Sequence, residues 1–172
     1  MKAELLAHDT ASQGSVDPTA FRQAMGLFAT GVGIVSVAKS DGSPSGITAN
    51  SIVSVSLEPM LVCWSIQNGS SQFDLYAKAE NFAISILNVD QRDLALRYAA
   101  RGDSLTQPSD FERTPSGAPV IAGAVGTIEC RHWSAYPAGD HTMIFGEVTG
   151  IRTANGVDPL GFFGGRFCRI AD

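Results

Sequence analysis

Short runs rich in β-branched residues recur along this chain, and turn residues separate most of them. Runs of this kind are typical of β-strands. They occupy residues 33–38, 47–57, 60–66, 82–87, 125–136 and 142–152. Parallel strands need long crossover connections, usually helices, so turn-connected runs predict antiparallel pairing. We therefore expect a mainly β protein, an antiparallel barrel or sandwich with a few short peripheral helices.

The segments between these runs carry turn and helix signals. Residues 137–140 read Pro-Ala-Gly-Asp, which predicts a hairpin turn between the last two strands. The expected helices occupy residues 17–28, 71–79 and 90–100. In the first of them, Asp17 is suited to the N-cap and Pro18 to the first turn. The Pro-rich residues 101–119 show no periodicity, and a connection of this length is either functional or merely flexible.

Length and charge exclude several classes of protein. A chain of 172 residues is expected to form one domain that buries roughly 70% of its unfolded surface. Its formal net charge of −5 argues against a broad electrostatic contact with nucleic acid or anionic lipid. No apolar run approaches the ~20 residues of a membrane span, and the first residues lack the apolar core of a secretory signal. We expect a flexible leader at residues 1–16, a domain at residues 17–172, and neither a nucleic-acid nor a membrane partner.

The cysteines predict the redox environment. Cys63, Cys130 and Cys168 are odd in number and far apart, without a CxxC spacing. Neither a disulfide framework nor a zinc ribbon is indicated, so we expect a reduced, cytoplasmic protein. Cys63 and Cys130 lie in strand patterns and are expected to be small buried residues. Trp64 and Trp133 are expected in the core or at an interface.

A polar loop joined to a rigid strand stands out at residues 46–59, GITANSIVSVSLEP. Backbone N–H groups and hydroxyls in such a loop can hold a small anionic ligand without a formal positive charge. The same residue types also form ordinary turns beside an edge strand. On these residues alone, the two interpretations remain open.

Several familiar motifs are incomplete or absent. The segment from Gly31 to Gly33 begins like a dinucleotide fingerprint but lacks the third glycine and enters a strand, which excludes a Rossmann site. There is no GxSxG elbow and no Walker A lysine. His132 and His141 lie near Glu129 and Asp140, but their spacing matches no usual ligand pattern. We therefore predict no metal site.

Seven sequence pieces together carry a family resemblance. They are ATG at 29–31, GITANS at 46–51, SVSLEP at 54–59, LVCWSIQNGSS at 61–71, NFAISIL at 81–87, IEC at 128–130 and AGDHTMIFGEV at 138–148. In this order and spacing, residues 21–170 resemble the short-chain flavin reductase family. The resemblance implies an antiparallel split β-barrel of the FMN-binding type. It also implies a homodimer with the flavin near the subunit interface.

The resemblance further implies an activity. Family members are NAD(P)H:flavin oxidoreductases, which transfer hydride from NADH or NADPH to FMN (or FAD) and supply reduced flavin to a separate monooxygenase. Two alternatives stay open: a flavin-dependent reductase of ferric iron or cobalt corrinoid, and a non-enzymatic flavin carrier. The flavin performs the difficult chemistry in such proteins, so no protein nucleophile is needed.

The same resemblance implies roles for individual residues. Thr48, Ala49, Asn50 and Ser51 are expected along the isoalloxazine, and Ser65, Gln67, Ser70 and Ser71 at the ribityl chain and phosphate. His141 is expected to help the nicotinamide settle over the flavin, and Arg166 and Phe167 belong to a segment that closes over the pocket.

Each of these roles has a structural alternative. Residues 48–51 can be turn formers only, Ser70 and Ser71 can cap the following helix, and His141 can satisfy a hairpin hydrogen bond. Phe167 can pack in the core instead of the pocket. FATG stands where Phe-Pro-Thr-Gly is common in the family, and SLEPM where Ser-Leu-Asp-Pro-Pro is usual, and neither change removes a group that the chemistry requires. GGRF has a smaller residue before Arg166 than many relatives carry.

Overall fold

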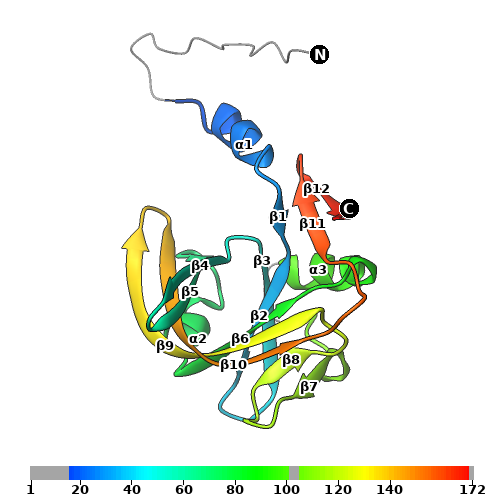
Figure 1. Cartoon of the computed structure of the whole chain (residues 1–172). Coiled ribbons are helices and arrows are strands. Elements are labelled where there is room, and N and C mark those ends of the chain that lie inside the picture. The colour runs from blue at the N-terminus through cyan, green and yellow to red at the C-terminus, as the bar shows by residue number, and fades with distance from the viewer. Residues whose placement is uncertain (1–15, 101–104, 171–172) are drawn as a thin grey trace.

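The structure is a computed structural model that describes residues 16–100 and 105–170 (Figure 1). A seven-stranded antiparallel sheet has the strand order β3-β2-β6-β9-β10-β5-β4. Its strands are β2 (Gly33–Ala38), β3 (Pro44–Ala49), β4 (Val53–Leu57), β5 (Met60–Gln67), β6 (Asn81–Ile86), β9 (Gly126–Ala138) and β10 (His141–Thr153). The expectation of a mainly antiparallel β protein is confirmed.

Smaller elements surround this sheet. The strands β1 (Thr30–Gly31), β11 (Leu160–Phe163) and β12 (Arg166–Arg169) form a second sheet, and β7 (Phe111–Arg113) pairs with β8 (Pro119–Ile121). The helices are α1 (Pro18–Gly26), α2 (Phe73–Ala77) and α3 (Arg92–Ala99), with single 3-10 turns at Val89–Gln91 and Pro108–Asp110. The expected helices are therefore confirmed, although each is shorter than the sequence pattern suggested.

The start of α1 follows the expected capping chemistry. The Asp17 carboxylate accepts hydrogen bonds from the backbone N–H groups of Thr19 and Ala20, and Pro18 is in the first turn. The helix ends at Gly26, two residues before the expected Phe28.

The expected continuous strand at residues 47–57 is wrong. The chain leaves β3 after Ala49 and begins β4 at Val53, and these two strands form opposite edges of the large sheet. Ser51 stabilises the crossing, because its Oγ accepts a hydrogen bond from the Ser65 N–H of β5 at 3.1 Å. The β-branched residues continue from the end of β3 into β4. Periodicity alone therefore does not show where one strand ends and the next begins.

Two further segments differ in detail from the sequence pattern. The β9 and β10 strands extend through Ala138 and from His141, so the hairpin turn is only Gly139 and Asp140. Gly139 has φ of +66°, a conformation that glycine adopts without strain. The connection 101–119 contains a 3-10 turn and β7, while residues 101–104 and the leader residues 1–15 lie outside the described residues.

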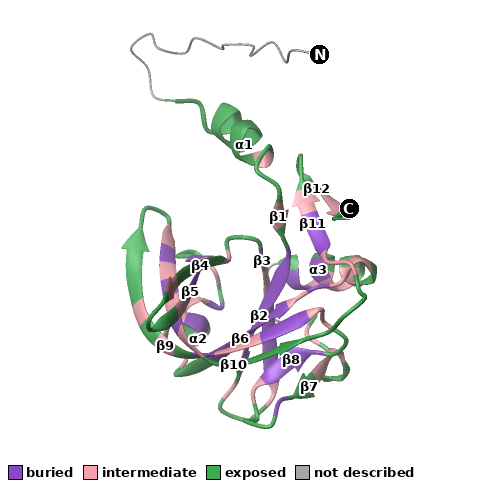
Figure 2. Ribbon diagram, viewed as in Figure 1, coloured by how far each residue is buried: buried purple, intermediate pink, exposed green. Residues whose placement is uncertain are grey.

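The larger apolar cluster joins buried residues of β2, β5, β6, β9 and β10 with Tyr76 of α2 (Figure 2). Trp64 is 1% exposed and meets Tyr76 of α2 and Phe82 edge-on, with ring centroids 5.7 and 6.2 Å apart. Cys63 and Cys130 are buried as expected, whereas Trp133 is 52% exposed and does not belong to the core. Burial, and then the neighbouring Glu129 charge, raises the pKa of the Cys130 thiol to about 12.

A second apolar cluster holds α3 against the sheet. Ala95 and Tyr98 of α3 pack with Ile34 and Ile121. The Tyr98 hydroxyl donates to Asp110 Oδ2 at 2.8 Å, so the connection after α3 is tied back to the helix. Burial raises the pKa of Tyr98, and the hydrogen bond to Asp110 adds to the effect. This arrangement fixes the end of α3 beside the edge strand β3.

Candidate functional site

Two adjoining cavities lie beside the end of β3. The larger, about 520 Å³, lies between β3, the turn after β5 and the end of α3. Its polar lining residues are Thr48, Gln67, Ser70, Ser71 and Gln72. The smaller, about 220 Å³, is lined by Val32, Thr48, Asn50, Ala99, Phe162 and Phe167. Because Thr48 and Ala99 line both, one cleft has a polar end and an apolar end.

The wall between β3 and α3 depends on close packing. Thr48 Oγ1 donates to the Ala95 carbonyl at 2.7 Å, so its proton is used within the protein and its oxygen remains an acceptor. Gly46 lies on the same strand, two residues before Thr48. A Cβ atom there would be 3.0 Å from Tyr98 and 3.1 Å from Ile34. Glycine at this position lets α3 approach β3 closely and places Ala99 in the cleft.

A tight turn forms the polar end of the cleft. The Ser70 N–H donates to the Gln67 carbonyl at 3.0 Å, and the Ser70 hydroxyl accepts from the Gln72 N–H at 3.2 Å. Ser70 therefore both orders the entry to α2 and lines the cavity. Gln72 is 8% exposed, and its Nε2 donates to Ser45 Oγ at 3.3 Å. The described lining of this end is uncharged, so it offers neutral donors to an anionic group.

The residues after Thr48 play different parts. Ala49 is 9% exposed and packs in the core, so its side chain is turned away from the cleft. Asn50 is exposed and lines the apolar cavity. The Ser51 hydroxyl accepts a hydrogen bond from the Ser65 N–H of β5. Neither residue lines a cavity. The polar loop is thus partly a binding surface and partly a structural connection.

His141 lies at the edge of the cleft. It is the first residue of β10 and pairs in register with Gln67, which lines the polar cavity. His141 Nδ1 is 2.7 Å from Asp140 Oδ1, and the imidazole is 42% exposed. The hydrogen bond from His141, and then its charge, holds the pKa of Asp140 below its ordinary value of 3.8.

Asn68 fixes this hairpin turn against the cleft. Its N–H donates to the Asp140 carbonyl at 2.9 Å, and its side chain bonds to Gly139 and Thr142 at 3.2 and 2.8 Å. The turn that carries His141 and the turn that lines the polar cavity are therefore one unit.

The C-terminal hairpin supplies the apolar end. Phe167 lines the smaller cavity and meets Phe162 edge-on at 5.4 Å between ring centroids. Arg166 is exposed, pairs with Phe163, and lines neither cavity. Of the two expected residues, the structure brings only Phe167 into the cleft.

Sequence reasoning missed part of the lining. The additional residues are Val32, Ile47, Gly69, Gln72, Ala99, Ala100 and Phe162. Small residues at the end of α3 leave room for a ligand, but alanine in a helix carries no such signal by itself. Among the described residues, no group of three or more His, Cys, Asp or Glu side chains could hold a metal ion. In the same residues, no helix is long and apolar enough to span a membrane.

The sheet and the two-part cleft define an antiparallel β protein that can bind an elongated ligand with one flat apolar end and one polar end. Residues 25–171 match the sequence profile described as Flavin reductase like domain. The chain belongs to this family.

Similar proteins include two curated relatives. The FMN reductase (NADH) SmoA of Agrobacterium fabrum is 42% identical over 158 residues, which cover 92% of this chain and 89% of that protein. The reductase component of the flavin-dependent trigonelline monooxygenase of Acinetobacter baylyi is 36% identical over 85% of this chain and 47% of that longer protein.

A solved structure gives the same fold. An NADH:FAD oxidoreductase of Streptomyces globisporus, in complex with NAD and FAD fragments, has a TM-score of 0.83 and 36% identity. The match covers 92% of this chain and 98% of that one.

Proposed function

We propose that this protein is an NAD(P)H:flavin oxidoreductase that reduces FMN or FAD. The observation that carries the proposal is the pair of adjoining cavities that share Thr48 and Ala99, one with a polar lining and one with a mainly apolar lining. A flavin has the matching form, with an apolar ring system and a phosphorylated polar chain. The similar proteins named for activity with a nicotinamide use NADH, so we expect NADH as the donor.

The residues present fit such a ligand. Gln67, Ser70 and Ser71 would receive the polar chain, with hydroxyl and amide donors instead of cations. Asn50 and Phe167 would border the ring system, and Thr48 offers an acceptor between the two ends. A bound flavin supplies the capacity to accept hydride, so the protein need only bind, orient and shield.

His141 would orient the donor. The hydrogen bond between Nδ1 and Asp140 leaves Nε2 of the neutral ring as an acceptor, which suits the amide N–H of a nicotinamide. Asp140 holds the ring in this tautomer. We assign His141 to positioning at the mouth of the cleft, because it flanks Gln67 and does not line either cavity.

The wider setting follows from the family. We propose that a separate flavin-dependent monooxygenase consumes the reduced flavin, as the reductase component among the similar proteins suggests. We also propose that the large sheet is the split β-barrel of the FMN-binding type, and that the protein works as a homodimer. Cys63, Cys130 and Cys168 are unpaired, which supports a reducing, cytoplasmic location.

Loss of absorbance at 340 nm tests the activity. Purified protein is mixed with NADH or NADPH, with and without added FMN or FAD. Oxidation that requires flavin and saturates with it is the expected result. Retention of flavin without turnover would contradict the proposal and favour a carrier, and turnover only with ferric iron or a cobalt corrinoid would redirect the electrons to another acceptor.

A further inference from the structure

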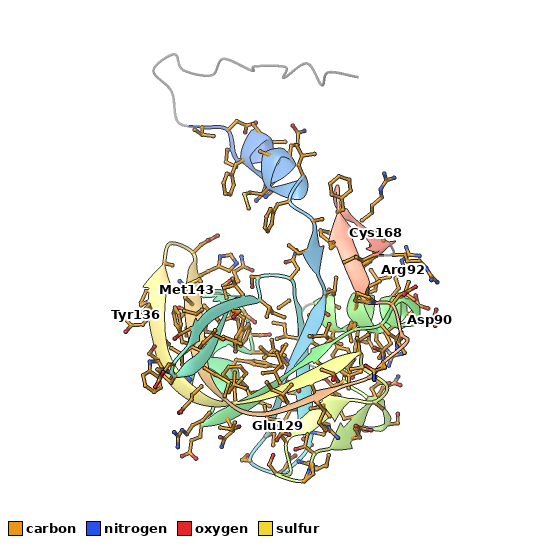
Figure 3. All side chains as sticks on the ribbon, in the orientation of Figure 1. Asp90, Arg92, Glu129, Tyr136, Met143 and Cys168 are labelled. Atoms are coloured by element: carbon orange, nitrogen blue, oxygen red, sulfur yellow. The ribbon has the colours of Figure 1, made fainter. Side chains whose placement is uncertain are left out.

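A third cavity lies apart from the cleft, beside the turn that joins β7 to β8. Its volume is about 330 Å³, within the range of roughly 300–1,000 Å³ that small-molecule sites occupy. The turn, the start of β6 and neighbouring residues of β9 and β10 enclose it, and none of its described lining residues lines either cavity of the cleft. Figure 3 shows one of them, Glu129, near the bottom of the view, far from Cys168 in the C-terminal hairpin.

The floor of the third cavity is apolar. It consists of Phe82, Pro119 and Cys130, which are all buried. Burial, and then the Glu129 charge, raises the pKa of the Cys130 thiol to about 12, so this charge acts on the floor of the cavity. A hydrocarbon group of a ligand would lose its contact with water on this floor.

Glu129 is the only charged side chain in the described lining. Thr114 Oγ1 donates to Glu129 Oε2 at 2.9 Å, and the Ser116 hydroxyl donates to the same oxygen. These two bonds fix the carboxylate and tie the β7–β8 turn to β9. The other oxygen, Oε1, lies over Gly150 of β10, where an added Cβ atom would be 3.3 Å from it. No side chain at position 150 therefore covers Oε1.

The Glu129 charge has no cationic partner within the part of the chain that the structure describes, since no Lys, Arg or His side chain there forms an ion pair with it. The arginines of the two adjoining strands are paired elsewhere. Arg131 lies 2.5 Å from Glu147, and Arg152 lies 3.5 Å from Glu112. A carboxylate that borders an apolar surface is stabilised by a cation beside it. The cavity therefore favours a positively charged ligand.

The hydroxyl groups in the lining add hydrogen-bond acceptors. Thr149 Oγ1 donates its proton to the Glu129 backbone carbonyl at 3.2 Å, and the Ser116 proton is used on the carboxylate. A hydroxyl whose proton is used within the protein offers only its oxygen lone pairs to a ligand. Glu129 Oε1, Ser116 Oγ and Thr149 Oγ1 are thus three acceptors in one cavity, and a primary ammonium group has three donors.

We propose that the third cavity binds a small organic cation, with a primary ammonium group at Glu129 and a hydrocarbon body on the floor of Phe82, Pro119 and Cys130. A phosphate or carboxylate ligand does not suit this cavity, because it would meet the unpaired Glu129 charge. The proposal is independent of the flavin site, since the two sites share no lining residue.

Ligand-observed NMR titrations of the full chain at neutral pH test the binding. Benzylamine and butylamine are the cationic probes, and benzyl alcohol and butanol are neutral probes with the same hydrocarbon bodies. We expect saturable binding of at least one amine, about 10-fold tighter than that of its matched alcohol, because a charge-assisted hydrogen bond is lost in the alcohol. Failure of both amines to bind, or equal binding of amines and alcohols, would overturn the proposal.

Glu129→Gln tests the charge. The amide keeps the shape of the side chain and an acceptor for Thr114, so circular dichroism should show a folded protein. We expect about 10-fold weaker binding of the amine and little change for the alcohol. Glu112→Gln is the matched control, because Glu112 is exposed on β7 and does not line this cavity. Equal amine affinity in Glu129→Gln and wild type would place the amine elsewhere and refute the proposal.

Thr149→Val keeps the test decisive if Glu129→Gln does not fold. Thr149 is exposed on β10, and valine has nearly the same shape without the acceptor oxygen. We expect about 3-fold weaker binding of the amine, since one neutral hydrogen bond is lost. An affinity equal to that of wild type would contradict the assignment of the acceptors.

Backbone amide NMR then locates the bound amine. We expect chemical-shift changes at Ser116, Gly117 and Thr149 on addition of the amine, and none at Ser70 and Ser71 in the cleft. Changes confined to the cleft would overturn the proposal. None of these measurements requires flavin, so they decide the cation site even if the proposed function fails.

Discussion

His141 occupies the first position of β10, beside Gln67 on the neighbouring strand, and its Nδ1 atom is 2.7 Å from Asp140. We expect His141→Ala to lower the efficiency of hydride transfer by about 10–100-fold, or roughly 1.4–2.7 kcal/mol. Flavin affinity should change little, because the imidazole does not line either cavity. Stopped-flow reduction by NADH measures the first quantity and a fluorescence titration the second. An unchanged reduction rate would remove His141 from the site.

The same pair of residues sets a pH dependence. The pKa of Asp140 is lowered from 3.8 by the hydrogen bond from His141 and then by its charge. A carboxylate with a depressed pKa adds stability above its unfolded pKa, and this contribution disappears as the pH falls through the lower folded value. We expect His141→Ala to move the pKa of Asp140 back up towards 3.8, as followed by NMR of the carboxyl carbon. A pKa that stays low in the variant would assign the shift to other groups.

The contact between β3 and α3 decides the shape of the cleft at the level of elements. An alanine Cβ at position 46 would lie 3.0–3.1 Å from Tyr98, Ile34 and Phe111. We expect Gly46→Ala to lower the free energy of unfolding by about 1–3 kcal/mol, because the inserted methyl forces the helix away from the strand. Flavin affinity should fall with it, since Ala99 at the end of α3 would move.

Urea unfolding and a flavin titration measure the two effects. Gly31→Ala is the control, because a Cβ there meets no atom within 4 Å. If both variants behave alike, the close approach of α3 to β3 is not what shapes the cleft.

Ligand binding should stabilise the whole molecule. A flavin at 100 times its Kd adds about 2.7 kcal/mol to the folded state, which corresponds to roughly 5–10 °C in Tm for a chain of this size. FMN should raise Tm more than riboflavin at equal concentration, because only FMN carries the phosphate that the Ser70–Gln72 turn would receive.

Asn50→Ala should reduce the shift produced by FMN, since Asn50 lines the apolar end. Differential scanning fluorimetry of wild type and variant measures these Tm shifts. Equal shifts for FMN and riboflavin, and for wild type and Asn50→Ala, would argue against this orientation of the flavin.

Local patterns in the sequence predicted much of this fold because their causes are local. Alternation and β-branching identified the strands of the large sheet apart from the break between β3 and β4, and the chemistry of Asp17 and Pro18 identified the start of α1. The burial of Cys63 and Cys130 followed from their positions in strand patterns. The order of seven pieces led to the family, and Thr48, Gln67, Ser70 and Ser71 do meet in one cavity.

Other features depended on contacts between distant segments. The chain crosses from one sheet edge to the other at residues 50–52, and the Thr48 hydroxyl is bonded to Ala95, a residue 47 positions away. Val32, Ala99 and Phe162 reach the same cavity from three segments that are far apart in the chain: the link between β1 and β2, the end of α3, and β11. Sequence by itself determined most strand segments of the large sheet and the chemistry that they carry, but it did not separate β3 from β4 or predict the small sheets. Only the tertiary structure decided which side chains face the cleft, because packing between segments far apart in the chain sets their direction.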